Sequence, residues 1–324
     1  MQGLVDRIFS IQTEQDFNHC ALEVFHFQKD QVPVYKTFLE LINRADPTHY
    51  SEIPHLPIAF FKTHQIVAGN KPIQQVFKSS GTTGMVRSAH YVSDLSVYER
   101  SFIPTYEQFL GKLEDQIIFA LLPNYVSQGE SSLVYMVDKL IAETKNPLSG
   151  YFLENTKDLL AALAEGRKTG KKLVLFGVSY ALLDLAALKP DLHDVTVIET
   201  GGMKGRRKEM TKEEMHRELL AGFGCEYIAS EYGMCELLSQ AYSDKNGLFE
   251  LPAWMKISLR EVNDPFALVT KEKTGGVNVM DLANIYSCAF IETQDLGRME
   301  AGKLRLMGRF DHSDIRGCNL LVAE

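Results

Sequence analysis

Apolar residues recur every three or four positions through the first 45 residues of this 324-residue chain. The series runs through Leu4, Ile8, Ile11, Phe17, Leu22, Phe25, Phe27, Phe38, Leu41 and Ile42. The first turn signal is "ADPTHY" at 45–50. Because this spacing places the apolar side chains on one face of a helix, it predicts a helical lead-in over residues 1–45.

From about residue 115 the pattern changes to short apolar runs that alternate with amphipathic stretches. The runs include "QIIFALL" (116–122), "KLVLFGV" (172–178) and "DVTVIET" (194–200), and "TKEEMHRELLAGFG" (211–224) has helical spacing. Strand, helix and strand in alternation predict an α/β fold with a largely parallel sheet flanked by helices. The region after residue 265 is richer in glycine and β-branched residues, and it predicts a smaller β portion on the same compact body.

Composition narrows the class of protein. The chain is 45% hydrophobic with a formal charge of −8, and no apolar run approaches the roughly 20 residues that cross a bilayer. We therefore expect a cytoplasmic globular protein that does not bind nucleic acid, since "KGRRK" (204–208) is too short a basic cluster for that. Five cysteines lie far apart without a C-x-x-C pair, which argues against a zinc site or a disulfide framework.

One loop, "FKSSGTTGMVR" (77–87), concentrates hydroxyl and glycine residues. Glycine lets backbone N–H groups approach a phosphate, and hydroxyls add further hydrogen bonds, so the loop is a candidate phosphate cradle. It is not a Walker A loop, because Gly84 is followed by Met85, Val86 and Arg87, and it does not match G-x-G-x-x-G. A flexible surface turn is the alternative interpretation.

Three further motifs follow or contain candidate strands. They are "GGM" (201–203), "SEYGMCE" (230–236), and "TQDLGR" (293–298) with "GRFDHSDIRG" (308–317). Motifs that follow parallel strands lie at the carboxyl edge of an open sheet, where ligands bind. We therefore expect these segments to share one site with the loop at 77–87.

The order of these motifs resembles that of the adenylate-forming superfamily, which includes acyl-CoA synthetases, firefly luciferase and peptide-synthetase adenylation domains. Within it, "FHFQ" (25–28), "EYGMCELLSQAYS" (231–243) and "DIRGCNLL" (314–321) look most like the acyl-protein synthetase of bacterial bioluminescence, of the long-chain-fatty-acid–luciferin-component ligase family. The resemblance covers residues 20–324. It implies an adenylation core over 46–308, preceded by the lead-in (1–45) and followed by a hinge and short tail (309–324).

The resemblance assigns residues to a bound ATP and a Mg²⁺ ion. The adenine would lie against Gly201 and Gly202 and stack on Tyr232, which is followed by Gly233 and Met234 of the same motif. Glu236 would hold the Mg²⁺ ion, Asp295 the ribose hydroxyls, and Arg309 the sugar or the phosphate. The β and γ phosphates would be held by Ser79, Ser80, Gly81, Thr82, Thr83 and Gly84.

The sequence also departs from the family pattern. Arg87, a candidate catalytic residue, stands where relatives usually carry Lys, so its charge is kept while its geometry differs. Cys235 replaces a Thr whose hydroxyl lies near the α-phosphate, and a thiol is a weaker donor or a rival nucleophile. Asp311 matches the hinge residue. The C-terminal lid and its Lys have no counterpart, so we expect the adenylation to be slower or to be completed by another group.

The implied activity is ATP-dependent activation of a fatty acid to acyl-AMP, followed by acyl transfer to a protein cysteine and delivery to a partner acyl-CoA reductase. Cys318 is the candidate acceptor, with a buried structural cysteine as the alternative. Two other functions stay open: a CoA ligase of the phenylacetate type, and a nucleotide-binding subunit without turnover. His90 and His312 are expected to be structural or surface residues and not acid–base catalysts.

Acid specificity is expected to come from 121–140 and 179–188. Either an acyl slot or ordinary core packing explains the apolar residues there. These residues are Val126, Leu133, Val134, Met136, Val178 and Leu182.

Overall fold

Three helices begin the chain. The structure, a computed structural model, describes residues 1–69, 71–80, 86–123, 129–152, 156–201, 210–269 and 273–309. Helices α1 (Gln2–Ile8), α2 (Glu14–Gln31) and α3 (Pro33–Ile42) lie in the segment predicted as a helical lead-in. The Thr13 hydroxyl accepts from the Asp16 N–H and the Asp16 carboxylate accepts from the Thr13 N–H, a capping box that starts α2.

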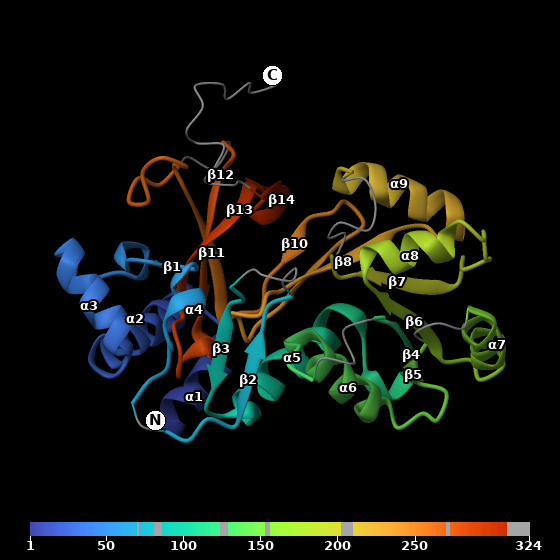
Figure 1. Ribbon diagram of the computed structural model, residues 1–324, viewed down its shortest axis with the longest axis horizontal. Coiled ribbons are helices and arrows are strands. Elements are labelled where there is room, and N and C mark those ends of the chain that lie inside the picture. The colour runs from blue at the N-terminus through green and yellow to red at the C-terminus, as the bar shows by residue number, and fades with distance from the viewer. Residues whose placement is uncertain are drawn as a thin grey trace.

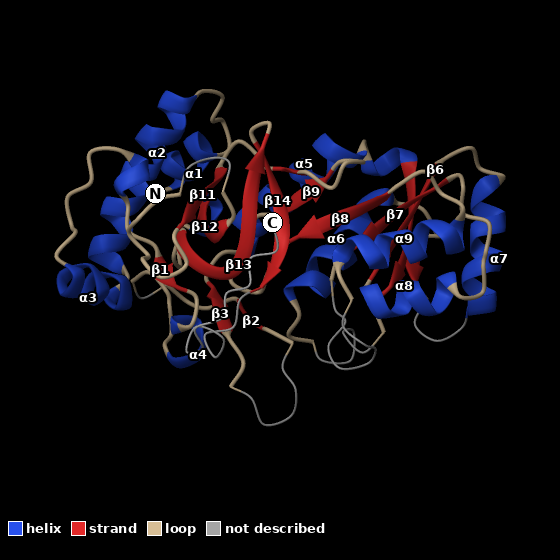
Figure 2. Ribbon diagram, turned by 90° about the horizontal axis from the view of Figure 1, so that it is seen from above, coloured by secondary structure: helices blue, strands red, loops and turns tan. Residues whose placement is uncertain are grey.

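One large sheet runs through the molecule, and the described strands order as β11-β12-β13-β14-β10-β9-β8-β7-β6-β4-β5 (Figures 1 and 2). Strands β5, β4, β6, β7 and β8 pair in parallel. The direction changes between β8 and β9, which are antiparallel. The parallel strands are β4 (Gln116–Leu121), β5 (Gly150–Tyr151), β6 (Lys172–Gly177), β7 (Val195–Glu199) and β8 (Ile228–Tyr232).

Helices cover both faces of the parallel strands (Figure 1). Ile118 of β4 packs in one core cluster together with α6 (Ser132–Thr144). Its neighbour Ile117 points to the other face, into a second cluster with α7 (Thr156–Arg167), α8 (Ser179–Ala186) and α9 (Lys212–Phe223). Because successive strand side chains alternate between faces, a strand buried on both sides is continuously apolar, as residues 117–121 are.

The remaining strands of the large sheet pair mainly in antiparallel fashion. They are β9 (Ala241–Ser243), β10 (Phe249–Glu250), β11 (Met255–Arg260), β12 (Gly275–Asp281), β13 (Phe290–Glu300) and β14 (Lys303–Arg309), with β1 (Leu56–Pro57) beside β13. Strands β2 (Gln75–Lys78) and β3 (Ala89–Val92) form a separate antiparallel pair. The predicted fold class, an α/β body with a largely parallel sheet and a smaller β portion, is confirmed, although β9–β14 continue the main sheet.

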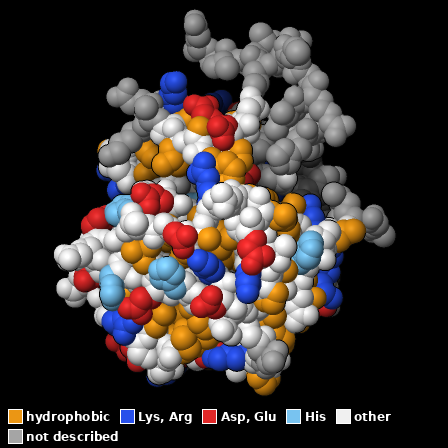
Figure 3. All heavy atoms as spheres, turned by 90° about the vertical axis from the view of Figure 1, so that its left-hand side faces the viewer, with side chains coloured by type: hydrophobic (Ala, Val, Ile, Leu, Met, Phe, Trp, Pro, Cys, Tyr) orange, Lys and Arg blue, Asp and Glu red, His pale blue; other side chains and the backbone are white. Residues whose placement is uncertain are grey.

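Two further helices and three 3₁₀ turns complete the described structure. They are α4 (Phe60–Thr63), α5 (Leu95–Leu110), and the 3₁₀ turns η1 (Tyr50–Glu52), η2 (Leu113–Asp115) and η4 (Leu282–Asn284). None of the helices within the described ranges combines the length and the apolar character needed to span a bilayer. On the side of the molecule that carries α2 and α3, charged side chains of both signs are interspersed with hydrophobic ones (Figure 3).

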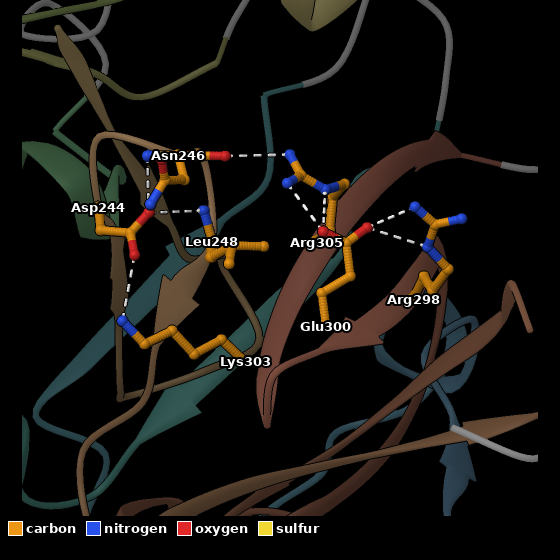
Figure 4. Close-up of polar contacts among 7 residues, drawn as sticks. All are labelled: Asp244, Asn246, Leu248, Arg298, Glu300, Lys303 and Arg305. Atoms are coloured by element: carbon orange, nitrogen blue, oxygen red, sulfur yellow. Dashed lines mark hydrogen bonds and ion pairs between the residues drawn. The ribbon is translucent and has the colours of Figure 1, made fainter. Parts of the chain in front are cut away.

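Ion pairs fix the β13–β14 hairpin beside the turn between β9 and β10 (Figure 4). Glu300 accepts from Arg298 at 2.5 Å and from Arg305 at 2.9 Å. The Asp244 carboxylate accepts from Lys303 at 3.1 Å and from two backbone N–H groups of its own turn. These contacts hold the hairpin whose far end carries Asp295 and Arg309, which are directly opposite each other in the register.

Candidate functional site

A cleft of about 900 Å³ opens at the carboxyl ends of β7 and β8, beside the end of the β13–β14 hairpin and the loop that joins β2 to β3. It lies where the sheet changes from parallel to antiparallel pairing. Predicted site residues from all these segments line it. They are Ser79, Ser80, Arg87, Gly201, Tyr232, Gly233, Met234, Cys235, Glu236, Asp295 and Arg309.

Several predicted residues cannot be placed in the cleft. Gly81, Thr82, Thr83, Gly84, Gly202, Asp311, His312 and Cys318 lie outside the described residues, as does Val126.

Asp295 connects two other predicted residues. Its Oδ2 accepts from the Tyr232 hydroxyl at 2.8 Å and its Oδ1 accepts from the Arg309 Nε at 2.8 Å. The Asp295 backbone N–H donates to the Thr293 hydroxyl at 3.1 Å. Burial, and next the Asp295 charge, raise the pKa of Tyr232 well above its ordinary value, so the phenol stays protonated. A carboxylate held in this way is oriented to accept from hydroxyl groups of a ligand.

Glu236 is a buried carboxylate in the wall of the cleft, 5% exposed. Burial raises its pKa, and a hydrogen bond from Ser88 opposes the rise. A divalent cation would stabilise the ionised form, and Mg²⁺ typically binds through one or two carboxylates together with phosphate oxygens. The described residues contain no cluster of three or more metal-binding side chains, so Glu236 fits such a shared site and not an all-protein one.

The backbone around Glu236 is held by two buried side chains. Asn284 Nδ2 donates to the Glu236 carbonyl at 2.8 Å, and a ring nitrogen of His90 lies 2.9 Å from the Cys235 carbonyl. Burial lowers the pKa of His90 to about 4, so the ring is neutral and structural, as expected. Burial and the nearby Glu236 raise the pKa of the Cys235 thiol, which argues against a nucleophilic role for it.

Arg87 is turned toward the protein backbone. Its Nε donates to the Ser79 carbonyl at 2.5 Å and its Nη2 to the Lys78 carbonyl at 3.3 Å. Its Nη1 lies 3.3 Å from Glu130. The Ser88 N–H also donates to the Ser79 hydroxyl at 3.0 Å, so both ends of the serine–glycine loop are joined. Arg87 therefore braces the loop.

A carboxylate that the sequence interpretation missed anchors the Gly201 turn. Glu199 is 2% exposed, and it accepts from the Ser179 hydroxyl and from the Gly201 N–H, each at 2.5 Å. Gly201 adopts φ +74°, a conformation that favours glycine. Although burial opposes ionisation, His216 and Lys212 lower the pKa of Glu199 to about 2. The sequence does carry a signal for Glu199: an acidic residue ends an apolar strand shortly before two glycines.

The predicted acyl slot is only partly in the cleft. Leu133 and Met136 line it, whereas Val134, Val178 and Leu182 are buried in the core, which is the alternative packing explanation. The same wall includes polar side chains that the sequence did not single out. They are Tyr98, Ser132, Glu231 and Gln240.

Solved structures share this fold. ATP-bound MatB from Rhodopseudomonas palustris aligns with a TM-score of 0.55 and 18% identity, over 74% of this chain and 49% of that chain. The chain thus spans about half the length of MatB. 2-Hydroxyisobutyryl-CoA ligase aligns in its thioesterification state, with 2-HIB-AMP and CoA, at a TM-score of 0.64 and 11% identity, over 96% of this chain and 68% of that chain.

The open conformation of the same ligase gives a TM-score of 0.62 at 10% identity, over 93% of this chain and 72% of that chain. No protein-family model matches the sequence, and no curated protein matches it. At such low identity the likeness establishes the fold. The chain therefore shares the fold of MatB and of 2-hydroxyisobutyryl-CoA ligase.

Proposed function

We propose that this protein activates a carboxylic acid with ATP to form an acyl-adenylate, and then transfers the acyl group to a thiol. The observation that carries the proposal is that loop, strand and hairpin residues from distant parts of the sequence line one cleft. Each has the chemistry that its role requires: Ser79 and Ser80 for phosphate, Tyr232 for the purine, and Asp295 for the ribose.

In the first step the substrate carboxylate attacks the α-phosphorus, and the bond between that phosphorus and the leaving pyrophosphate breaks. Two anions approach each other, so catalysis depends on positioning and on cationic and N–H groups that stabilise the developing charge. Arg309, held by Asp295, supplies one such charge at the cleft. Glu236 would hold a Mg²⁺ ion, and that ion would supply positive charge to neutralise the phosphates.

In the second step a thiolate attacks the acyl carbonyl and AMP leaves. We propose Cys318 as the acceptor, a long-chain fatty acid as the substrate, and an acyl-CoA reductase as the partner that receives the acyl group. The resemblance of the motifs to acyl-protein synthetases supports these assignments. The apolar side chains of Leu133 and Met136 in the cleft wall are compatible with an acyl chain.

Pyrophosphate exchange tests the first step. With purified protein, ATP and Mg²⁺, label from pyrophosphate should enter ATP only when a suitable acid is present. A panel of fatty acids of increasing length, with aromatic and hydroxy acids beside them, identifies the class. If ATP binds but no acid stimulates exchange, the protein is a nucleotide-binding subunit without turnover.

Mass spectrometry of the intact protein tests the acceptor. After incubation with ATP and a fatty acid, the protein should gain one acyl mass that Cys318→Ser abolishes while acid-dependent exchange continues. The alternative is a CoA ligase, favoured by the structural likeness to a ligase that holds CoA. A free acyl-CoA product with no acylated protein would establish that alternative.

A further inference from the structure

We propose that Lys78 is a phosphate-binding cation of the cleft. Its ammonium group pairs with the Glu130 carboxylate until the triphosphate displaces that carboxylate. This inference rests on the proposed function, which places the phosphates beside Ser79 and Ser80. No sequence motif singled out either residue. Lys78 is the last residue of β2, directly before those serines, and it lines the cleft with them.

The two cations next to the serines are differently engaged. Arg87 donates from its Nε and Nη2 to the carbonyls of Ser79 and Lys78, so moving its side chain would release the loop. The Lys78 ammonium lies 2.6 Å from Glu130 Oε1, and among the described residues this ion pair is what engages the Lys78 side chain. Lys78 is thus the cation that can change partner without disturbing the backbone.

Glu130 can release Lys78 without moving its own segment. Its carbonyl accepts from the Lys78 N–H at 2.8 Å, so the two backbones stay joined whatever the side chains do. The next residue, Ser131, caps α6 by accepting from the Val134 N–H. Glu130 is therefore held between a strand end and a helix start, with only its carboxylate able to leave.

The existing ion pair is weak enough to be replaced. The side chains of Lys78 and Glu130 are 39% and 37% exposed, and pairs this accessible are strongly screened by water. Lys78 lowers the pKa of Glu130, so the carboxylate is ionised at neutral pH. A triphosphate carries several charges over a similar space, and it forms stronger charge-assisted hydrogen bonds with an ammonium than a single carboxylate does.

Calorimetry on the whole chain tests this exchange of partners at Lys78. It measures the binding of inorganic pyrophosphate and of ATP, and it does not rely on turnover. Lys78→Met should weaken the binding of both about tenfold, and Lys78→Arg should retain most of the affinity. Glu130→Gln should tighten binding about threefold, because the competing anion is gone. In the Glu130→Gln background, the loss caused by Lys78→Met should be larger than in the wild type.

Lys139 and Glu99 provide a matched control. They form a 2.8 Å ion pair of similar exposure outside the lining of the cleft, so Lys139→Met and Glu99→Gln should leave both affinities unchanged. Circular dichroism checks that each variant is folded.

Opposite signs for Lys78→Met and Glu130→Gln support the exchange. Unchanged affinity in Lys78→Met, or weaker binding in Glu130→Gln, overturns it while leaving the adenylation proposal intact. Failure of the wild type to bind either ligand overturns both.

Discussion

Two carboxyl groups on neighbouring strands, Glu199 and Glu231, have opposite pKa shifts. Glu199 accepts hydrogen bonds and lies near His216 and Lys212, which lower its pKa to about 2 against the effect of burial. For Glu231, burial and then the charge of Glu199 raise the pKa to about 8. At neutral pH Glu231 is therefore mainly a neutral acid in the wall of the cleft.

The Glu231 shift predicts a pH-dependent stability. Because its folded pKa lies above the unfolded value of 4.5, its contribution is fully present below pH 4.5 and is lost as pH rises through about 8. Glu231→Gln, which imitates the neutral acid, should therefore raise the free energy of unfolding above pH 8 by about 1–3 kcal/mol. It should have little effect near pH 5.

Urea unfolding at several pH values measures this difference. Glu226→Gln, an exposed change close by in the sequence, is the control and should shift stability equally at all pH values. A constant offset between Glu231→Gln and the wild type from pH 5 to 9 would contradict the raised pKa of Glu231.

The contacts of Asp295 predict an effect of its charge on ATP binding. Asp295→Asn keeps the size of the side chain but removes the charge that holds Arg309 and accepts from Tyr232. We expect ATP binding to weaken about tenfold, equivalent to about 1.4 kcal/mol. Calorimetric titration with ATP measures it. Asp244→Asn, a carboxylate with lysine and backbone partners outside the cleft lining (Figure 4), should bind ATP as the wild type does.

At the scale of elements, the packing of α8 on α9 depends on one glycine. A Cβ placed on Gly222 of α9 would lie 2.6 Å from both the Cβ and the carbonyl oxygen of Ala186. Gly222→Ala should therefore destabilise the protein by about 1–3 kcal/mol, despite the better helix propensity of alanine. Gly150→Ala is the control, because nothing lies within 4 Å of the added methyl group.

Thermal unfolding compares the two glycine variants. Equal melting temperatures of Gly222→Ala and Gly150→Ala would contradict the prediction. They would mean that α8 and α9 can move apart to admit the methyl group without a loss of stability. Because Lys212 begins α9 and also lines the cleft, a helix displaced by Gly222→Ala should weaken ATP binding as well.

At the scale of the molecule, the N-terminal helices and the main sheet share one hydrophobic core. Phe17 and Phe25 of α2 belong to the same core cluster as Phe290 and Ile291 of β13. Gln28, fully buried, donates to the carbonyls of Asn284 and Ile285. The boundary predicted at residue 45 stays a prediction about domains, while the contacts join both sides of it.

The single tryptophan can show whether the N-terminal helices and the sheet unfold together. Trp254 packs edge to face against Phe9 with ring centroids 4.9 Å apart, and its Nε1 donates to Ser239 at 3.0 Å. Tryptophan fluorescence and far-ultraviolet circular dichroism should therefore show coincident urea transitions. A fluorescence change that precedes the loss of helix signal would mean that α1 detaches on its own.

The order of elements and the identity of the motifs were readable from the sequence. Helical spacing identified the region of α1–α3, and continuous apolar runs identified β4, β6 and β7, because these patterns depend on neighbours in the chain. The motifs at Ser79, Gly201, Tyr232 and Asp295 were all expected in one site. The rule that ligands bind at the carboxyl edge of parallel strands is local enough to apply without coordinates.

Only the tertiary structure decided what each charged group contacts. Arg87 was expected to be a catalytic residue, and this role stays a prediction. In the structure its side chain braces the loop, and Lys78 and Glu130, 52 positions apart, meet beside it. The pKa values of Glu199 and Glu231 depend on burial and on each other across two strands. Burial and long-range charge come from parts of the chain that are distant in sequence, and no local pattern records them.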